Sequence, residues 1–521
     1  MGPQTIYLPD GQTINVTPVF AGLFFKSNDL STHNNAFPIG WTIVIHTEEC
    51  SAERKKHRSS SSGDGGANDG NAADDQRPHI HSFTTPTLHH DSLFISSISN
   101  PSSNDFKPAA SPTRQMAMML WVTLYWYFHQ AAPGTTLATE SCKHTPKAGR
   151  PKGDWRIRIK RDGMLRGRNL IPKLERMGLI TTYDSSVGTT MQDTDEAWDR
   201  MFVSQRMFWQ IPGRLFLFTL QPNPKSPGSY PGSPTGSRPG SPPAGDLALR
   251  TTLSGPELSD IPASPHPITL TSMPSFPIGP YFSASHLPTY YPPPPLLYTM
   301  TNNIRHPVRP KPPRMGEVFY TRYIPSVGQY LSFRVASISP KPVPYMGPMG
   351  PKPPSQPHLG LMTDQALLQH WHSNPRVSAF WGKYAPDMLE KALRSRHSFP
   401  AIGMWDGVPF GYFELYWVKE DILGQYIGGQ AADDFDRGCH VLIGEEWARG
   451  RVQSWLTSLA HWAFAADNRT MSLCLEPRVD NARFIQHLEF AGFTKEKEIS
   501  FPHKQAWFGR LRRENWVAPA L

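Results

Sequence analysis

The chain of 521 residues is poor in cysteine, and this scarcity limits the class of protein. No two cysteines have the Cys-x-x-Cys spacing of a redox motif or a zinc site. The histidines are scattered without ligand spacing, so we expect no metal site. Small secreted domains need a denser, paired cysteine framework. We therefore expect free thiols in a reducing compartment at Cys50, Cys142, Cys439 and Cys474.

Long hydrophobic runs and targeting signals are also missing. The most apolar window, Met116–Gln130, has about twelve largely apolar residues, whereas a membrane-spanning helix needs about twenty. This window is more typical of a buried helix or strand. The first residues lack the basic and apolar regions of a signal peptide, and the final segment, Val517–Leu521, is not a Ser-Lys-Leu peroxisomal signal. These features favour the cytoplasm over the peroxisome and predict no membrane partner.

Proline, by contrast, is abundant, and its distribution divides the chain. The 54 prolines are roughly twice average usage, and many fall in a tract near residues 221–300. We interpret this tract as a flexible linker. A charged, Ser/Gly-rich stretch near residues 51–80 is typical of a disordered insertion. We therefore expect an N-terminal domain of mixed α and β structure at residues 1–220 and a second domain at residues 315–513.

Positive charge is in excess as well. The net charge of +9 suits anionic partners such as phosphates, coenzymes or nucleic acid. The basic block Trp155–Arg176 and the Pro-rich tract would also fit a nucleic-acid- or protein-binding module, which is the alternative from another functional class. The block carries one tryptophan and little aromatic interleaving, which argues against stacking on bases. We expect no nucleic-acid partner.

Residues 315–513 carry the clearest secondary-structure signals. An Asp-Gly turn at Asp406 and Gly407 lies between two β-rich runs and predicts a hairpin. A helix beginning near Arg451 is predicted from apolar residues at helical spacing. In chain order the region is predicted as β, α, α, β, β, β, α, β, α, β, β. Four segments stand out within it: "HWHSNPRVSAFWG" (370–382), "GYFELYWVKEDILGQY" (411–426), "DRGCHVLIG" (436–444) and "LEPRVDNARFIQHLEFAGF" (475–493).

This order and these segments resemble the GCN5-related N-acetyltransferases, and within them the siderophore hydroxylamine acyltransferases of the aerobactin type. N-terminal segments such as "LPDGQT" and "VFAGLFFKS" extend the likeness to the fungal hydroxyornithine acyltransferases of hydroxamate siderophore biosynthesis. The resemblance implies an α/β fold of the GCN5-related type, with a mixed central sheet flanked by helices. It also implies that residues 315–513 are the catalytic acyl-coenzyme A N-acyltransferase domain and that the N-terminal domain is a second, degenerate acyltransferase-like domain.

The activity that the resemblance implies is transfer of an acyl group, acetyl in the first instance, from coenzyme A to the hydroxylated side-chain nitrogen of hydroxyornithine. The product would be the hydroxamate of a siderophore of the ferrichrome or ferricrocin type. Anhydromevalonyl-coenzyme A is the alternative donor. No permanently bound cofactor is expected, because the acyl-coenzyme A is a cosubstrate. An ornithine monooxygenase and a nonribosomal peptide synthetase are the implied functional partners, and a homodimer is compatible with the resemblance.

Coenzyme A should lie along the strand "GCHVLIG" and reach the helix that follows. In this fold the pyrophosphate rests on the loop that opens that helix, where backbone amides and glycine allow close approach of an anion. A backbone amide of the strand would stabilise the oxyanion. The residues predicted to contact the coenzyme are Val441, Leu442, Arg449, Gly450, Arg451 and Val452.

His440 is the predicted general base, because imidazole titrates near neutrality and the resemblance places a catalytic histidine on this strand. We expect Asp480 to be the acid that orients His440 or the hydroxylamine, although an aspartate before a helix is also an ordinary N-cap. Bacterial members read Glu-Pro-Asp-x-Arg-Asn where this chain has Glu-Pro-Arg-Val-Asp-Asn at 476–481, with acid and base exchanged.

Further residues are predicted to line the substrate pocket, each with a structural alternative. Acids before the strand could hold the α-ammonium of hydroxyornithine, but a run of acids is more often a solvated loop. Aromatic residues at helical spacing are more often core. The two cysteines near the strands, Cys439 and Cys474, are expected to be buried thiols. The predicted substrate contacts are Trp371, Arg376, Trp381, Asp433, Asp436 and Asn481.

Overall fold

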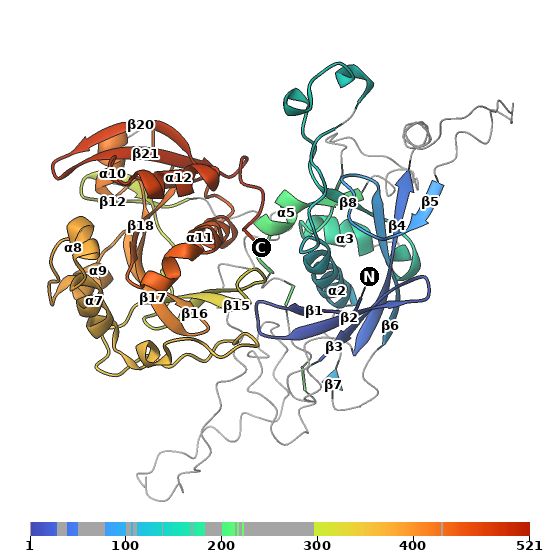
Figure 1. The fold of residues 1–521 in the computed structure, drawn as a ribbon, viewed down its shortest axis with the longest axis horizontal. Helices are drawn as coiled ribbons and strands as arrows, with labels where there is room; N and C mark the ends of the chain where they lie inside the picture. Colours follow the sequence, from blue (N-terminus) through green and yellow to red (C-terminus); the bar gives the residue numbers. More distant parts are fainter. Residues whose placement is uncertain are drawn as a thin grey trace, which may run out of the picture.

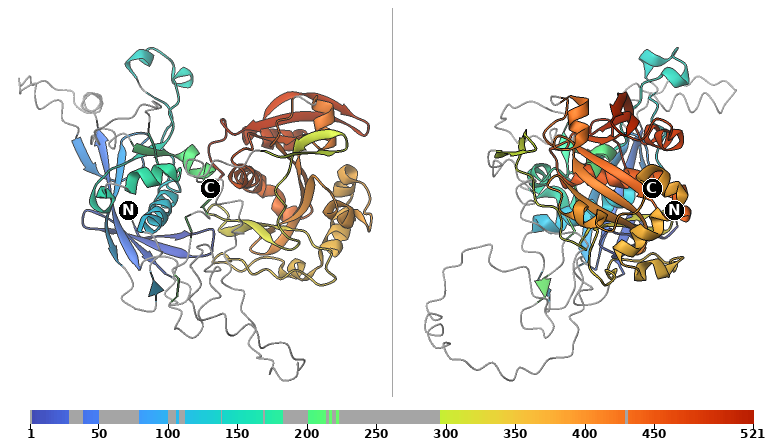
Figure 2. Two further views of the ribbon diagram at one scale, coloured as in Figure 1. Left: turned by 180° about the vertical axis from the view of Figure 1, so that it is seen from behind. Right: turned by 90° about the vertical axis from the view of Figure 1, so that its left-hand side faces the viewer.

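The computed structural model arranges the chain in two halves that pack side by side (Figures 1 and 2). The predicted insertion at 51–80 and the predicted linker at 221–300 lie almost wholly outside the described residues, so neither prediction is tested. We refer to residues 2–222 as the N-terminal half and to residues 296–521 as the C-terminal half. The described residues are 2–28, 39–49, 79–99, 106–107, 112–137, 139–167, 170–182, 201–213, 216–217, 221–222, 296–428 and 431–521.

The N-terminal half is built on a nine-stranded sheet. Its strand order is β1-β2-β3-β4-β6-β8-β10-β9, and β5 pairs with β4. Its first two strands, β1 and β2, pair antiparallel around Gly11, whose φ of 91° favours glycine. The strands are β1 (Gln4–Tyr7), β2 (Thr13–Val19), β3 (Gly22–Ser27), β4 (Gly40–Glu49), β5 (His79–Ser82), β6 (Asp91–Ser99), β8 (Arg156–Ile159), β9 (Thr181–Thr182) and β10 (Met201–Ser204).

The apolar window of the sequence forms most of helix α2 (Pro112–Tyr127). Every residue from Met116 to Phe128 is buried. Because neighbours cover all sides of the helix, its sequence shows an unbroken apolar run instead of a single stripe. Within the described part of the chain, no helix is long and apolar enough to cross a membrane.

The basic block is part of the same core. It forms β8 and helix α3 (Leu170–Arg176), and a short helix α5 (Gln205–Gln210) follows further along the chain. Ile157 and Leu174 from the block are fully buried. The alternation of basic and apolar residues that suggested a nucleic-acid surface therefore belongs to a half-buried strand and an amphipathic helix. Two minor pairs complete the small elements of the chain: β7 (Phe106–Lys107) with β11 (Gln221–Pro222), and β12 (Tyr298–Thr301) with β13 (Ile304–Pro307).

The C-terminal half is built on an eight-stranded sheet of order β14-β15-β16-β17-β18-β19-β21-β20. The predicted hairpin is confirmed: β16 and β17 pair antiparallel around Asp406 and Gly407, whose φ values are 46° and 81°. The sequence interpretation missed β14 and the short helices α8 and α10. The strands are β14 (Val318–Ile324), β15 (Gln329–Val335), β16 (Ser398–Trp405), β17 (Val408–Trp417), β18 (Arg437–Ile443), β19 (Ser472–Leu475), β20 (Thr494–Phe501) and β21 (Lys504–Arg512), and the helices are α7 (Asp364–His372), α8 (Pro375–Trp381), α9 (Met388–Leu393), α10 (Ile422–Ile427), α11 (Val452–Ala466) and α12 (Ala482–Phe490).

The two faces of this sheet have different neighbours. Side chains alternate along β17, so Phe413 packs on one face against Trp455 of α11, with ring centroids 5.5 Å apart. Tyr412 lies on the other face, in the cluster that includes Leu367 of α7 and Val377 of α8. Figure 1 shows α7, α8 and α9 on the side of the sheet away from the N-terminal half, and α11 towards it. The face under α8 is thus the outward one.

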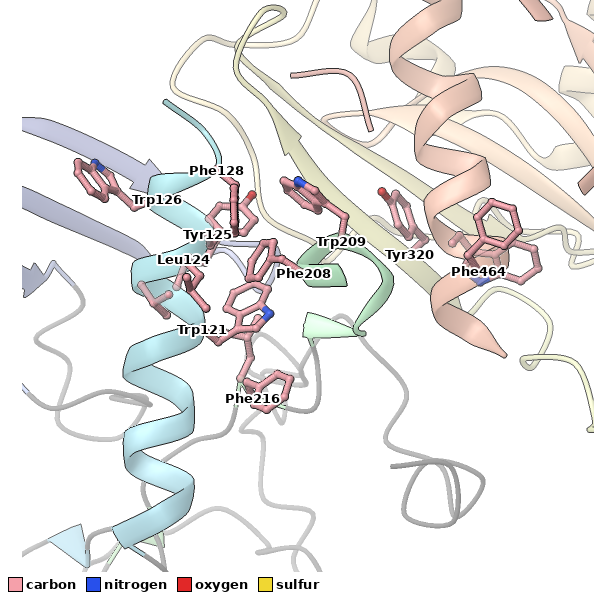
Figure 3. Close-up of a cluster of buried hydrophobic side chains, with 14 of the residues drawn as sticks. Trp121, Leu124, Tyr125, Trp126, Phe128, Phe208, Trp209, Phe216, Tyr320 and Phe464 are labelled. Carbon is pink, nitrogen blue, oxygen red and sulfur yellow. The ribbon is translucent and has the colours of Figure 1, made fainter. Parts of the chain in front are cut away.

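The halves meet through an aromatic cluster (Figure 3). Trp209 of α5 packs edge-on against His461 of α11, with ring centroids 5.4 Å apart. The ring of Phe208 packs against that of Trp121 of α2, with centroids 5.5 Å apart. Figure 3 shows these rings on α2 and α5 facing Tyr320 of the C-terminal half. One buried apolar cluster therefore runs through both halves.

Both sheets repeat one order of strands. In the N-terminal half β4 pairs antiparallel with β6, β6 pairs in parallel with β8, and β8 pairs antiparallel with β10. In the C-terminal half β17, β18, β19 and β21 follow the same succession. A helix connects the parallel strands in each case, α2 in the first and α11 in the second. This repetition supports the expectation that the N-terminal half is a second acyltransferase-like domain.

Candidate active site

β18 and β19 separate within the sheet, and this separation opens the candidate site. The two strands pair in parallel only at Arg437 with Leu473 and at Gly438 with Cys474. β18 continues beyond these pairs and stays joined to β17 along its whole length. After Gly438, the other edge of β18 therefore has no strand partner among the described strands. A gap of this kind can admit an extended ligand beside the free edge of β18.

His440 lies in this gap between two carboxylates. Its Nδ1 is 3.1 Å from Oε2 of Glu414, which stands directly opposite on β17. Its Nε2 is 2.9 Å from Oε1 of Glu476, which follows the last residue of β19. The histidine side chain is 32% exposed and that of Glu414 is 24% exposed, whereas that of Glu476 is 4% exposed. His440 thus bridges the two diverging strands and remains partly accessible.

Each carboxylate also accepts a hydrogen bond from a tyrosine. The hydroxyl of Tyr412 donates to Oε1 of Glu414 at 2.9 Å, and the hydroxyl of Tyr416 donates to Oε2 of Glu476 at 2.8 Å. An ionised carboxylate has only acceptor sites, so these donors favour the charged form of both acids. The ring of Tyr416 lies 4.7 Å from that of His440 and helps to fix its orientation.

These contacts perturb the pKa of all three groups. Burial disfavours the imidazolium, but the charge of Glu476 and hydrogen bonds with both carboxylates outweigh burial and raise the pKa of His440 to about 10. Burial would raise the pKa of Glu476, but the charge of His440 and its hydrogen bond lower it to about 2. The pKa of Glu414 is also lowered, against burial, by its hydrogen bond with His440. Near neutral pH the group is an imidazolium between two carboxylates.

The free edge of β18 presents backbone groups to the gap. The carbonyl oxygen of Val441 accepts a hydrogen bond from Nε1 of Trp381 on α8 at 3.2 Å, so the backbone of Val441 faces away from β17. The N–H of a strand residue points to the same side as its C=O. Because the backbone groups of successive strand residues point to opposite sides, the amide of the next residue, Leu442, points towards β17. Of the two amides predicted to stabilise the oxyanion, the geometry therefore favours that of Val441.

The loop before α11 forms a short 3₁₀ helix, Glu446–Arg451, that continues into α11 at Val452. The side chain of Arg449 is 44% exposed, and its Nη1 lies 3.8 Å from Oε1 of Glu446. Its partial burial and the nearby charge of Arg483 lower its pKa. No heavy atom would lie within 4 Å of a Cβ added at Gly450, so the space beside it is open. This loop therefore presents open backbone at Gly450, next to the Arg449–Glu446 ion pair.

Arg451 differs from the prediction made for it. Its Nη1 donates to Oε1 of Gln329 at 2.6 Å, and its guanidinium lies over the rings of Trp405 and Trp447. These contacts hold the side chain against the sheet. The expected anion contact is therefore better supported for Arg449 than for the side chain of Arg451.

Two predicted substrate contacts are corrected by burial. Trp371 is 1% exposed, and its Nε1 donates to Oε1 of Glu445 at 2.8 Å. Asp436 is fully buried, and its Oδ2 pairs with Nη1 of Arg510 at 2.7 Å. Burial raises the pKa of Asp436 to about 6 even though Arg510 acts against that shift. The structure contradicts both predictions, because neither side chain is free to meet a substrate.

The remaining predicted contacts lie at the surface or around α8. Arg376 donates to the carbonyl of Gly444 at 3.1 Å and thereby ties α8 to the end of β18. The ring of Trp381 packs edge to face against that of His440, with ring centroids 6.5 Å apart. Asp433 is exposed, and Asn481 sits at the start of α12 without a side-chain cap hydrogen bond.

Asp480 is also placed differently from its prediction. Its carboxylate binds Arg478, with Oδ1 2.6 Å from Nε and Oδ2 2.8 Å from Nη2, and it is 59% exposed. The acids that orient His440 are Glu414 and Glu476 instead. The structure therefore does not place Asp480 at His440, because each of its carboxylate oxygens accepts a hydrogen bond from Arg478, and its other predicted role, orienting the hydroxylamine, stays a prediction.

Sequence reasoning missed Glu414 and Glu476. Both are acids at the centre or end of otherwise apolar strands, "GYFELYW" and "SLCLE", and a buried acid without a partner would be costly. An acid in an otherwise apolar strand is therefore the sequence signal that could have identified Glu414 and Glu476 as functional or paired residues. The two cysteines are buried as expected, Cys439 at 2% and Cys474 at 0% exposure. Within the described residues, no group of three His, Cys, Asp or Glu side chains could hold a metal ion.

The repeated strand order allows the equivalent place in the N-terminal half to be inspected. The parallel pair β6 and β8 aligns Leu93 with Ile159, as Gly438 aligns with Cys474. Two residues beyond this pair, Ile95 lies opposite Ile43 on the face that Trp41 shares with α2, whereas His440 lies opposite Glu414 on the face away from α11. Both isoleucines are fully buried. The N-terminal sheet keeps the strand order, and on the face away from α2 it places Phe94 of β6 opposite Val44 of β4.

Comparisons with known proteins agree with this geometry. Residues 360–501 match the family described as acetyltransferase (GNAT) domain. N5-hydroxyornithine acetylase sidL of Beauveria bassiana is 56% identical over 97% of this chain and 100% of that protein. The N(6)-hydroxylysine O-acetyltransferase of Escherichia coli is 37% identical over 40% of this chain and 60% of that protein. Among solved structures, aminoglycoside acetyltransferase AAC(6')-Ib with coenzyme A is 22% identical over 29% of this chain and 91% of that chain, with a TM-score of 0.27.

The fold, the separated strands and the matched domain define an acyl-coenzyme A-dependent N-acyltransferase of the GCN5-related class. The 56% identity with N5-hydroxyornithine acetylase sidL, over the full length of that protein, then identifies the family within this class. The chain belongs to the family of fungal hydroxyornithine acyltransferases.

Proposed function

We propose that the protein transfers an acetyl group from acetyl-coenzyme A to the hydroxylated side-chain nitrogen of N5-hydroxyornithine. The observation that carries this proposal is the Glu414–His440–Glu476 group in the gap between β18 and β19. A relative that aligns over 97% of this chain is named for the same acceptor and for acetyl transfer. The product would be a hydroxamate, a bidentate oxygen ligand suited to ferric iron in a siderophore of the ferrichrome or ferricrocin type.

The positions of the two substrates follow from the strand geometry. The thioester would lie along the free edge of β18, with its carbonyl oxygen at the amide of Val441. The pyrophosphate would rest at Arg449, Gly450 and Val452, where the open backbone lies. The hydroxylamine would enter from the outward face, between α8 and the end of β19.

The proposed chemistry moves one proton from nitrogen to sulfur. A hydroxylated amine is weakly basic and largely neutral near pH 7, so its nitrogen can attack the thioester carbonyl directly. The N–H proton passes to the carboxylate of Glu414, and the imidazolium of His440 gives its Nδ1 proton to the departing thiolate. Glu414 then returns its proton to Nδ1 of His440, 3.1 Å away. His440 thus acts as the acid of the pair, and Glu414 takes the role of base that the sequence interpretation gave to the histidine.

The acyl donor is the finer part of the proposal. A relative from Beauveria bassiana named N(5)-hydroxyornithine:cis-anhydromevalonyl coenzyme A-N(5)-transacylase SIDF is 33% identical over 40% of this chain and 42% of that protein. The acetylase aligns over far more of the chain and at higher identity. We therefore propose acetyl-coenzyme A as the donor, with anhydromevalonyl-coenzyme A as the alternative.

Compartment and partners are proposed on the same basis. An N-hydroxylating ornithine monooxygenase would supply the acceptor, and a nonribosomal peptide synthetase would consume the hydroxamate. We propose the cytoplasm as the place of reaction and, as a separate possibility for assembly, a homodimer.

The experiment that tests this function follows thiol release from purified protein with N5-hydroxyornithine and each donor in turn. Release with acetyl-coenzyme A well above that with anhydromevalonyl-coenzyme A is expected. Equal or reversed release would change the donor, and no release with either would end the proposal. Ornithine, which lacks the N-hydroxyl group, is the matched acceptor control, because its side-chain amine is protonated near pH 7 and cannot attack the thioester.

A further inference from the structure

The ion pair between Arg478 and Asp480 lies beside the catalytic group without taking part in it. The two side chains form a bidentate pair, with Nε to Oδ1 at 2.6 Å and Nη2 to Oδ2 at 2.8 Å. The side chain of Arg478 is 38% exposed and that of Asp480 59%. An exposed pair of this kind usually contributes little to stability. This pair, however, lies only two residues beyond Glu476 of the catalytic group.

The chain and α8 tie this pair to the active site. Glu476, which holds His440, precedes Arg478 by only two residues, a span of at most about 7 Å of extended chain. The guanidinium of Arg478 lies 4.4 Å from the ring centroid of Phe380, and its Nη1 reaches the carbonyl of Ala379. The next residue of α8, Trp381, contacts the ring of His440. The end of α8 therefore touches the histidine and the ion pair on the same outward face.

Backbone hydrogen bonds to β21 hold this segment in place. The N–H of Trp507 donates to the carbonyl of Pro477 at 2.9 Å, and the N–H of Val479 donates to the carbonyl of Gln505 at 3.1 Å. Arg478 also forms an isolated bridge with Ala506 of β21. A preorganised pair of opposite charges loses little entropy when it binds a matching ligand.

We propose that Arg478 and Asp480 bind the α-carboxylate and the α-ammonium of the acceptor amino acid. Arg478 keeps guanidinium hydrogens beyond those directed at Asp480, since a guanidinium has five donors. Asp480 has carboxylate lone pairs left for an ammonium group. The zwitterionic end of an α-amino acid carries the complementary pair of charges on one carbon.

This inference rests on the proposed function and makes it more specific. It assigns the pair to recognition of the amino acid end, whereas Glu414 and His440 act at the nitrogen.

The test compares two acceptors on purified full-length protein. N5-hydroxyornithine has the zwitterionic end, and N-butylhydroxylamine has the reacting nitrogen without it. We expect Arg478→Ala and Asp480→Asn each to reduce kcat/KM for hydroxyornithine by roughly 10- to 100-fold, mainly through KM, because each removes a charged hydrogen bond. Neither should change kcat/KM for N-butylhydroxylamine or the Tm. Arg478→Lys, which keeps the charge, should restore part of the loss.

The matched control is Lys495→Ala, which breaks another exposed ion pair, 2.8 Å from Glu498 on β20. It should leave both acceptors unaffected. Equal losses on both acceptors in the Arg478 and Asp480 variants, or no loss on either, would overturn the inference. Calorimetry of hydroxyornithine binding to protein saturated with coenzyme A separates this result from a failure of the proposed function: weaker binding to Arg478→Ala supports the subsite even without turnover, and unchanged binding overturns it.

Discussion

His440 has a carboxylate at each ring nitrogen, and this arrangement decides which protonation state can take part in catalysis. An imidazole that is hydrogen-bonded to two ionised carboxylates must donate from both nitrogens. It then has no lone pair with which to accept a proton. The base has to be a carboxylate, and Glu414 is the more exposed of the two.

The first prediction concerns the pH dependence of turnover. Because the pKa of His440 is raised to about 10, the imidazolium persists above neutrality, and kcat/KM should fall only as the pH rises through about 10. A neutral histidine base would give no such decrease at high pH. The measurement is kcat/KM from pH 6 to 10.5, corrected for uncatalysed thioester hydrolysis. A profile that keeps rising to pH 10.5 would refute the role of the imidazolium.

The same shift predicts how stability depends on pH. The folded pKa of His440 lies above its unfolded value near 6.5, so its contribution to stability is complete below that value and is lost as the pH rises through about 10. The urea midpoint of the protein should therefore decline between pH 7 and pH 10. His440→Gln should show a smaller decline over the same range, and parallel curves for both proteins would contradict the linkage.

The third prediction tests Glu414 by itself. Glu414→Gln keeps the shape of the side chain and removes the proton acceptor, so turnover should fall by roughly 10² to 10⁴. Glu498→Gln on β20, an exposed acid of another ion pair, should retain full activity. Near-normal turnover in Glu414→Gln would return the role of base to another group.

Sequence alone could identify the histidine but not its partners, for a physical reason. His440 belongs to an apolar strand with a recognisable motif. Glu414 and Glu476 are 26 and 36 residues away along the chain, and only the pairing of β17 with β18 and the end of β19 bring them together. Trp371 and Asp436 were misjudged for the related reason that burial depends on distant partners, Glu445 and Arg510.

At the scale of elements, local patterns predicted most of the C-terminal half. The hairpin at Asp406 and Gly407 and the stripe of α11 follow from turn chemistry and helical spacing, which are local properties. The missed helices α8 and α10 have seven and six residues, too short for a clear periodic signal. The missed strand β14 lies next to β15 at the edge of the sheet.

The fourth prediction concerns the loop that opens α11. A side chain at Gly450 would enter open space, so Gly450→Val should fold normally but obstruct an anion that approaches the backbone there. We expect KM for acetyl-coenzyme A to rise at least roughly tenfold, a loss near 1.4 kcal/mol of binding, with an unchanged Tm. Gly134→Val, where a Cβ would also meet no atom within 4 Å, is the control. An unchanged KM would place the pyrophosphate elsewhere.

At the scale of the whole molecule, the two halves share one buried cluster. Trp209 of α5 is 2% exposed and packs on His461 of α11, so the N-terminal half covers the inner side of the catalytic sheet. The N-terminal half therefore supports the fold of the C-terminal half through this shared cluster.

The fifth prediction tests this support. Trp209→Ala should lower the free energy of unfolding by about 3–5 kcal/mol, because it leaves a cavity between the halves. Phe20→Ala at the exposed tip of the β2–β3 hairpin should change it by less than about 0.5 kcal/mol. Urea unfolding followed by tryptophan fluorescence provides the measurement. A small effect at Trp209 would mean that the halves are energetically independent.

The central claim is that the acyl group goes from coenzyme A to the hydroxylated nitrogen. The most direct measurement is the structure of the product formed from acetyl-coenzyme A and N5-hydroxyornithine, determined by mass spectrometry and by formation of the coloured ferric complex. We predict a product one acetyl group heavier that binds ferric iron as a hydroxamate, and its absence with His440→Ala. An acetylated product that does not bind ferric iron would show transfer to oxygen or to the α-amine, and would contradict the account.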